Sequence, residues 1–283
     1  TETMKLGLVL EGGGMRGIYT CGVLDVMIEK GFEPDVLCGT SAGALFGINL
    51  PSKQKGRAYR YNYKHCIDPN YVSLRSLLKT GNMVNVDFAY NRIPNELAPF
   101  DEETYEKSKT KVFATVTNVR TGKAEYKLIE NCYEQIDWLR ASGSLPFISH
   151  RVKIDGEEYL DGGLVDNIPL DKAFEEGCDK VVVVLTRPME FRMNEPLYLP
   201  SKIFYPKEKN LQAALKVRSE NYQKRLEQIR RLQKEGKIFV FSPETILPIR
   251  RLERNPLHIK AIYKIGLQDA TNRWQELEEY LKK

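Results

Sequence analysis

Short apolar runs alternate with helix-like stretches in the first part of the chain. The run at residues 5–10 leads into glycines and then into residues 18–30, where the apolar positions have helical spacing. A second run at residues 35–38 leads into Gly39-Thr40-Ser41-Ala42-Gly43 and a helix-like stretch at residues 44–50. A strand, a loop and a helix thus follow one another twice, which predicts an α/β fold with a parallel sheet covered by helices.

Further strands are expected in the middle of the chain. Residues 111–118 and 124–129 look like paired strands around a turn, and residues 152–159 contain a hairpin turn at Asp155-Gly156. The valine-rich run at residues 180–186 is typical of a buried strand of a parallel sheet. The sheet is therefore expected to be mainly parallel, with antiparallel additions.

The last third of the chain has a different pattern. Residues 188–206 contain four prolines and are predicted to form a boundary or a covering loop. Residues 207–236 have the apolar spacing of one long amphipathic helix. One more strand is expected at residues 237–242, and a final helical stretch from about residue 255.

Charge separates the same two parts. From residue 201 to the end there are 19 Lys and Arg against 10 Asp and Glu, a net charge of +9, so residues 1–200 carry −4 of the total of +5. We therefore expect a main domain at residues 4–190 and a basic helical extension at residues 191–283, with one further strand and a role that the sequence does not reveal.

Composition limits the class of protein. A hydrophobic content of 42% is too high for a disordered chain, and no apolar run approaches the ~20 residues that cross a bilayer. The five cysteines are scattered without paired spacing, which favours reduced thiols in a cytoplasmic protein. The first residues lack a secretory leader pattern, and removal of a leader before Met4 stays open.

The stretch Gly39-Thr40-Ser41-Ala42-Gly43 matches the pattern of a nucleophile elbow, G-x-S-x-G, between a strand and a helix. In such an elbow a tight turn exposes the serine hydroxyl, and only small neighbours permit the close approach of the chain. Ser41 is thus a candidate nucleophile, with Gly39 and Gly43 as elbow glycines. An ordinary packed Gly-Ser turn is the alternative.

A serine nucleophile needs a base, and two kinds are possible here. A triad of the α/β-hydrolase type has the chain order Ser, Asp, His, which leaves His258 as the only histidine after the later acids. The other kind is a carboxylate, and Asp161 follows an apolar run and precedes Gly162-Gly163, which would let the chain turn beside a cleft. Asp166 is a nearby competitor.

The stretch Gly12-Gly13-Gly14-Met15-Arg16-Gly17 also matches the dinucleotide-binding pattern G-x-G-x-x-G. That function requires an acidic residue at the end of the second strand to bind the ribose. Glu33 and Asp35 precede that strand, whereas Ser41 follows it. A cofactor site is therefore disfavoured. A binding protein with a degenerate site is also disfavoured, because the serine, the aspartate and the glycines are all present.

In order and spacing, these three motifs together resemble those of the patatin-like phospholipases, over about residues 4–186. The resemblance implies a three-layer α/β/α fold and a Ser–Asp dyad with no catalytic histidine, cofactor or metal. Ser41 would then be the nucleophile and Asp161 its base. The other implied site residues are the oxyanion-hole glycines Gly12, Gly13 and Gly14, the loop supports Arg16 and Gly17, the elbow glycines Gly39 and Gly43, the acid-loop glycines Gly162 and Gly163, and the acyl-pocket segment at residues 141–147.

The expected function is therefore hydrolysis of a lipid or fatty-acyl ester, as a phospholipase, lysophospholipase or esterase. Two interpretations of the basic extension stay open. It is either a solvated helical face or a surface with Lys216, Arg218, Lys224 and Arg225 that attracts anionic lipid headgroups. The second would place a cytoplasmic enzyme at the inner face of the membrane. No nucleic-acid partner is expected.

Overall fold

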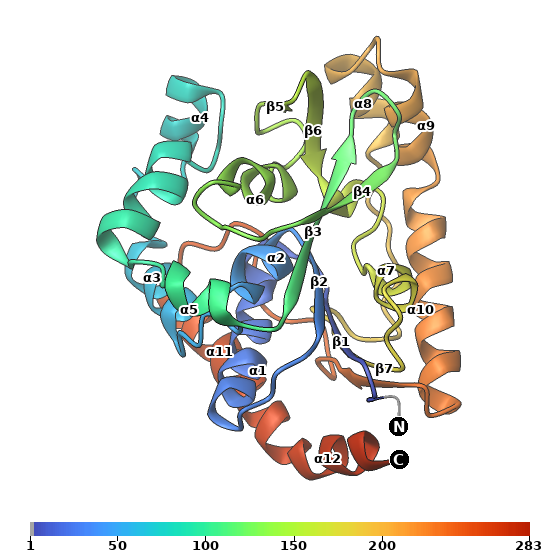
Figure 1. The fold of residues 1–283 in the computed structure, drawn as a ribbon. Coiled ribbons are helices and arrows are strands. Elements are labelled where there is room, and N and C mark those ends of the chain that lie inside the picture. Colours follow the sequence, from blue (N-terminus) through green and yellow to red (C-terminus); the bar gives the residue numbers. More distant parts are fainter. Residues whose placement is uncertain (1–2) are drawn as a thin grey trace.

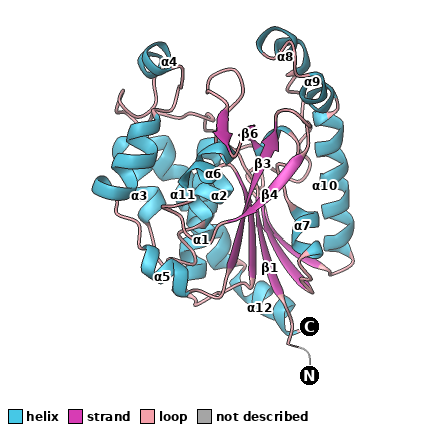
Figure 2. Ribbon diagram, turned by 45° about the horizontal axis from the view of Figure 1, so that its top comes forward, coloured by secondary structure: helices cyan, strands magenta, loops and turns pink. Residues whose placement is uncertain are grey.

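The computed structural model describes residues 3–283 and contains one eight-stranded sheet between layers of helices (Figure 1, Figure 2). The strands are β1 (Leu6–Leu10), β2 (Val36–Thr40), β3 (Lys111–Asn118), β4 (Ala124–Leu128), β5 (Val152–Ile154), β6 (Glu157–Asp161), β7 (Lys180–Val184) and β8 (Ile238–Phe241). Their order is β5-β6-β3-β2-β1-β7-β8, with β4 paired to β3. The strands β3, β2, β1, β7 and β8 are parallel to one another, and β4, β5 and β6 pair antiparallel. The predicted α/β class with a mainly parallel sheet is confirmed.

The α-helices are α1 (Ile18–Glu29), α2 (Ala42–Gly47), α3 (Arg57–His65), α4 (Leu74–Thr80), α5 (Glu102–Lys107), α6 (Ile136–Ser142), α7 (Leu170–Glu175), α8 (Tyr198–Phe204), α9 (Lys209–Lys216), α10 (Arg218–Lys234), α11 (Pro256–Asn272) and α12 (Trp274–Lys282). Two 3-10 turns, η1 (Gly14–Gly17) and η3 (Gly162–Leu164), and a π-helical segment, η2 (Phe88–Leu97), complete the chain. Helices α1, α2, α3 and α11 lie on one side of the sheet, and α7 and α10 lie on the other (Figure 2).

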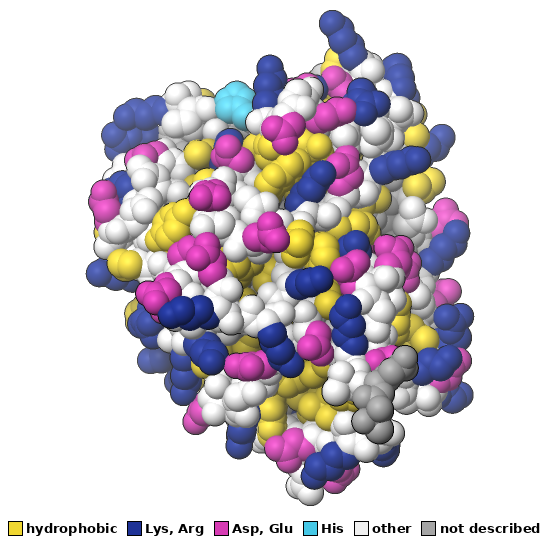
Figure 3. Space-filling model, viewed as in Figure 1, with side chains coloured by type: hydrophobic (Ala, Val, Ile, Leu, Met, Phe, Trp, Pro, Cys, Tyr) yellow, Lys and Arg dark blue, Asp and Glu magenta, His cyan; other side chains and the backbone are white. Residues whose placement is uncertain are grey.

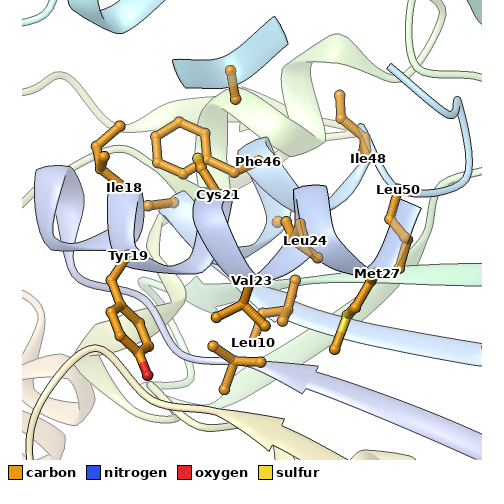
Figure 4. Close-up of a cluster of buried hydrophobic side chains, with 14 of the residues drawn as sticks. Leu10, Ile18, Tyr19, Cys21, Val23, Leu24, Met27, Phe46, Ile48 and Leu50 are labelled. Atoms are coloured by element: carbon orange, nitrogen blue, oxygen red, sulfur yellow. The ribbon is translucent and has the colours of Figure 1, made fainter. Parts of the chain in front are cut away.

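Side chains of the central strands alternate between two separate cores, because successive residues of a strand face opposite sides of its sheet. In β1, Leu8 and Leu10 belong to the core under α1, whereas Val9 belongs to the core under α7 and α10. Figure 4 shows the first of these cores, with Leu10, Ile18 and Phe46 among its side chains. The last four of the five residues of β7 are buried, as the valine run predicts.

The region expected to be one long helix at residues 207–236 is instead two helices, α9 and α10, separated at Val217. The two halves pack on different parts of the protein. Leu211 and Leu215 of α9 join a small cluster around Leu160, whereas Leu226 of α10 joins the core of the sheet. One straight helix cannot serve both clusters, so the apolar spacing alone misleads here. The loop expected at residues 188–206 likewise contains the helix α8.

The C-terminal part is joined closely to the N-terminal part. Strand β8 extends the sheet beside β7, with Val181 paired to Ile238, and α11 crosses α1. At this crossing a Cβ on Gly22 would lie 2.5 Å from the carbonyl oxygen of Tyr263, so only glycine permits the approach. The hydroxyl of Tyr19 on α1 also donates to Asp269 of α11 at 2.8 Å.

Candidate active site

Ser41 lies at a sharp turn between β2 and α2. Its φ of 55° and ψ of −123° lie outside the regions that L-residues ordinarily adopt, so the turn is strained. The flanking glycines have steric reasons: a Cβ on Gly39 would lie 2.6 Å from the amide nitrogen of Ala44, and one on Gly43 would collide with the carbonyl oxygen of Leu10. The two glycines thus permit the tight turn of the chain at Ser41.

The sheet brings Ser41 and Asp161 together across 120 residues of sequence. Strand β3 pairs with β2 through Thr115 opposite Thr40, and with β6 through Val116 opposite Asp161. The ends of β2 and β6 therefore meet. There, the Ser41 hydroxyl donates a 2.7 Å hydrogen bond to Oδ2 of Asp161.

The environment of Asp161 makes its carboxylate more basic. Asp161 is 4% exposed and Ser41 is 7% exposed. Burial raises the pKa of Asp161, and the hydrogen bonds from the Gly163 N–H and the Ser41 hydroxyl oppose that rise. The Gly163 N–H donates to Oδ1 at 2.7 Å, which leaves Oδ2 directed at Ser41. A fixed carboxylate of raised pKa beside a hydroxyl is suited to accept its proton.

The competitor Asp166 has other partners. Its carboxylate accepts from the Tyr126 hydroxyl and lies 3.4 Å from the guanidinium of Arg225. Its carbonyl oxygen accepts from the Thr40 hydroxyl at 2.9 Å. Asp166 thus holds Thr40, the residue before Ser41, whereas the Ser41 hydroxyl is bonded to Asp161.

The glycine loop lies beside the Ser–Asp pair, but its N–H groups are not equivalent. The Gly12 N–H donates to the carbonyl oxygen of Asn167 at 3.2 Å. Within residues 3–283, the N–H groups of Gly13 and Gly14 have no backbone acceptor, as expected at the start of the 3-10 turn η1. Gly13 and Gly14 line a cavity with Ser41 and Asp161. These two N–H groups are therefore the ones free to bind an anion.

Two residues outside the predicted site, Glu11 and Asn167, hold this loop in place. Glu11 is fully buried and accepts from the Thr186 N–H at 2.7 Å and the Tyr222 hydroxyl at 2.6 Å. Asn167 donates from its side chain to the Gly12 carbonyl at 3.1 Å. The one local indication of a role for Glu11 is its position, a charged residue directly after the apolar run of β1.

The segment at residues 141–147 also contacts the site. Ser142 accepts from the Ser41 N–H at 2.9 Å and donates to the Thr115 carbonyl at 2.7 Å, which fixes the elbow to β3. Gly143 and Leu145 line an apolar cavity. Gly17 allows the glycine loop to pack closely on the start of α2, because a Cβ on Gly17 would lie 2.9 Å from the Cβ of Ala42.

This apolar cavity begins at Ser41 and Gly14 and extends between the helices that precede β3. Most of its lining is hydrocarbon from a part of the chain, residues 45–100, that carries no sequence motif. Among its lining side chains are Leu45, Phe46, Ile93, Phe100, Leu139 and Leu252. An apolar cavity of this kind, which opens beside the Ser41 hydroxyl, has the character of a site for a fatty-acyl chain.

A second, polar cavity meets the first at Ser41 and Gly14. Four arginine side chains line it: Arg16, Arg187, Arg218 and Arg251. Only Arg16 was expected near the site. The others come from segments after β7 that have no pattern linking them to a catalytic loop.

The three histidines have other surroundings. His258 pairs with Glu253 at 2.9 Å, His150 contacts the carbonyl oxygen of Thr80 at 2.9 Å, and His65 packs edge-on against Phe88. In the part of the chain that the structure describes, no histidine is hydrogen-bonded to Ser41. The ribose-binding candidates Glu33 and Asp35 precede β2, at the opposite end of that strand from Ser41. Among residues 3–283, no group of three or more His, Cys, Asp or Glu side chains is arranged to hold a metal ion.

The sequence matches known families in two places. Residues 8–174 match the patatin-like phospholipase family, and residues 208–282 match a domain of unknown function, DUF6363. The uncharacterized protein YjjU of Escherichia coli K12 is 30% identical over 190 residues, which cover 66% of this chain and 53% of that protein.

Fungal lysophospholipases are more distant relatives. Lysophospholipase nte1 of Aspergillus niger is 27% identical over 64% of this chain and 12% of its own length. Lysophospholipase NTE1 of Saccharomyces cerevisiae is 28% identical over 63% of this chain and 10% of its own length. The chain thus spans about half of the bacterial relative and a small part of the fungal ones. The crystal structure of VipD from Legionella pneumophila overlaps with a TM-score of 0.44 and 15% identity, over 96% of this chain and 67% of that one.

Proposed function

The chain belongs to the patatin-like phospholipase family, and on that premise we propose that it is a serine lipid acyl hydrolase with a Ser41–Asp161 dyad. The observation that carries the proposal is the 2.7 Å hydrogen bond between Ser41 Oγ and Asp161 Oδ2, at a strained elbow that opens on an apolar cavity. We place the catalytic unit at residues 4–190, with the extension at residues 191–283.

The reaction follows from this geometry. Asp161 accepts the hydroxyl proton of Ser41 as its oxygen attacks the ester carbonyl carbon. The resulting oxyanion accepts hydrogen bonds from the N–H groups of Gly13 and Gly14, where each donor contributes about 3 kcal/mol to catalysis. Asp161 then protonates the leaving alcohol. In the second half, Asp161 deprotonates a water molecule that attacks the acyl-serine, releasing the fatty acid and restoring the serine hydroxyl.

The substrate class follows from the apolar cavity and from the relatives. An acyl chain in this cavity would place its ester carbonyl at Ser41. Because the fungal relatives are named lysophospholipases, a single-chain lysophospholipid is the first substrate to test. Release of fatty acid from such a substrate by the purified protein, absent with Ser41→Ala, would support the proposal. No release from any long-chain ester would contradict it.

The alternative with a histidine base leads to a separate prediction. We expect His258→Ala to keep kcat/KM for a short p-nitrophenyl ester within about twofold of wild type, because His258 is half-exposed and bonded to Glu253. Steady-state kinetics of the two proteins check this. A loss of 100-fold or more would restore the triad of the α/β-hydrolase type.

We also propose that the enzyme contacts anionic membranes from the end of the molecule that carries α8. Arg218 and Arg225 do not serve this purpose, since Arg218 is 8% exposed and Arg225 is paired with Asp171 at 2.9 Å. Of the two remaining candidates, Lys216 is exposed, whereas Lys224 is exposed but pairs with Glu220 at 3.2 Å. Figure 3 shows several basic side chains over the end where Figure 1 places α8 and α9. Among the described residues no helix is long and apolar enough to cross a bilayer.

Helix α8 carries exposed apolar side chains next to two further lysines. Leu199, Ile203 and Phe204 of α8 are 68%, 78% and 53% exposed, and Lys202 and Lys207 lie between or beside them. We call these five residues the α8 patch. Phe204 packs on Phe147, next to the segment that lines both cavities. Exposed apolar groups flanked by lysines are the pattern of a surface that enters the headgroup layer of an anionic membrane.

The α8 patch gives a second prediction. We expect Ile203→Glu to lower partitioning onto phosphatidylglycerol-containing vesicles roughly tenfold, because the variant lacks an apolar side chain that would enter the bilayer and adds a charge that anionic lipids repel. Co-sedimentation at low salt measures this. Ile246→Glu, at a residue that is also exposed and lies outside the patch, is the matched control. Equal partitioning of the Ile203 variant and wild type would contradict the assignment of the patch.

A further inference from the structure

The polar cavity beside Ser41 is lined by four guanidinium groups and one carboxylate, that of Asp161. Arg16 belongs to the glycine loop and Arg187 follows β7. Arg218 begins α10, and Arg251 lies in the loop before α11. The last two belong to the region that matches a domain of unknown function.

Nearby carboxylates balance only part of this charge. Glu195 pairs with Arg187 at 2.5 Å, Arg218 at 3.0 Å and Arg251 at 3.3 Å. Although burial opposes it, these three cations lower the pKa of Glu195 to about 2. One carboxylate thus serves three arginines, and the nearby Glu11 is already bonded to Thr186 and Tyr222.

Arg16 is the least compensated of the four. Its buried Nε has no hydrogen-bond partner among the described residues. Burial, together with the charges of Arg187 and Arg251, lowers the pKa of Arg16 to about 10. A buried donor without a partner is costly, so the guanidinium of Arg16 would gain from an acceptor that the described chain does not supply.

We propose that this polar cavity binds a phosphate group on the alcohol side of the scissile ester, so that the preferred substrates are single-chain lipids with a phosphate beside the ester. The proposal rests on the proposed acyl hydrolase function and adds the leaving group to it. The C-terminal region supplies Arg218 and Arg251 to the active site, which gives this region a role in substrate selection.

The two cavities fix the direction in which such a substrate binds. They meet at Ser41 and Gly14, so an ester carbonyl at Ser41 has its acyl chain in the apolar cavity and its alcohol in the polar one. Guanidinium groups bind phosphate through paired N–H donors. Several of them around one cavity offer more donors than a carboxylate accepts, which favours phosphate as the ligand.

The test compares two substrates that differ only in the phosphate: oleoyl lysophosphatidic acid and monooleoylglycerol. We expect Arg251→Gln to lower the ratio of their kcat/KM values, phosphate over neutral, at least about tenfold, as for loss of a charged hydrogen bond. Arg250→Gln removes an exposed neighbouring arginine that does not line the cavity, and should leave the ratio unchanged. Activity on the neutral ester shows that each variant is folded.

A binding measurement separates this inference from the proposed function. We expect the Ser41→Ala protein to bind glycerol 3-phosphate in calorimetry, and to bind glycerol far more weakly. Adding Arg251→Gln should weaken phosphate binding at least about tenfold, and adding Arg250→Gln should not. Phosphate binding without hydrolysis of either ester would refute the hydrolase function alone. Hydrolysis of both esters without a preference for the phosphate, or binding of glycerol 3-phosphate that Arg251→Gln does not weaken, would overturn the phosphate site alone.

Discussion

Ser41→Ala is expected to abolish ester hydrolysis, lowering kcat/KM by about 10⁴-fold or more towards the uncatalysed background. Alanine lacks the oxygen that attacks the carbonyl, and among the described residues no other hydroxyl is hydrogen-bonded to the carboxylate of Asp161, since the Thr117 hydroxyl donates to its backbone carbonyl instead. Fatty acid release from a lysophospholipid and p-nitrophenol release from a short ester both measure the loss.

The matched control is Ser52→Ala. Ser52 is also a buried serine, 1% exposed, but it lines neither cavity. Its hydroxyl has no hydrogen-bond partner among the described residues, so its removal should be harmless. Substantial residual activity in Ser41→Ala would mean that another residue is the nucleophile.

Asp161→Asn is expected to lower kcat/KM by about 10³-fold or more while leaving the protein at least as stable as wild type. The amide oxygen of asparagine still accepts from the Gly163 N–H, but the amide cannot take a proton from Ser41. Hydrolysis assays and thermal melting at pH 7 measure the two effects. Asp155→Asn, in the exposed hairpin turn, is the control for the substitution itself.

The stability half of this prediction follows from the pKa of Asp161. Burial raises that pKa above its ordinary value of 3.8, so folding favours the protonated form. The resulting stabilisation is complete below the unfolded pKa and is lost as the pH rises through the folded pKa. At pH 7 the ionised carboxylate therefore costs stability, and the neutral asparagine removes that cost. A clear fall in Tm would contradict this account of the site.

The same shift predicts how activity depends on pH. Only the ionised carboxylate accepts a proton, so kcat/KM should be constant above the raised pKa of Asp161 and fall as the pH drops through it. This acid limb should be unchanged in His258→Ala.

The sequence allowed prediction of those parts of the fold and site that depend on local rules. The elbow around Ser41, the turn after Asp161 and the glycine loop each need small residues at fixed spacing, because a Cβ would meet backbone or side-chain atoms there. Strands such as β1 and β7 are predictable for a similar reason, since a short apolar run of this length and composition is typical of a buried strand.

Features that depend on long-range packing were not predictable in the same way. The apolar cavity is built from helices without a motif, and Arg251 reaches the site only because its loop lies against Gly14, where its carbonyl accepts from the Met15 N–H at 2.8 Å. The break at Val217 reflects packing on two different clusters. The engagement of the Gly12 N–H by Asn167 likewise depends on a contact across 155 residues, which no local pattern records.

The most direct test of the dyad is covalent labelling with a fluorophosphonate, which reacts with activated serines. Intact mass and peptide mapping should find one adduct, on Ser41, in both wild type and His258→Ala. The adduct should be absent in Ser41→Ala and form far more slowly in Asp161→Asn. An adduct on a different serine, or labelling of Ser41 that depends on His258 and not on Asp161, would contradict the Ser41–Asp161 mechanism.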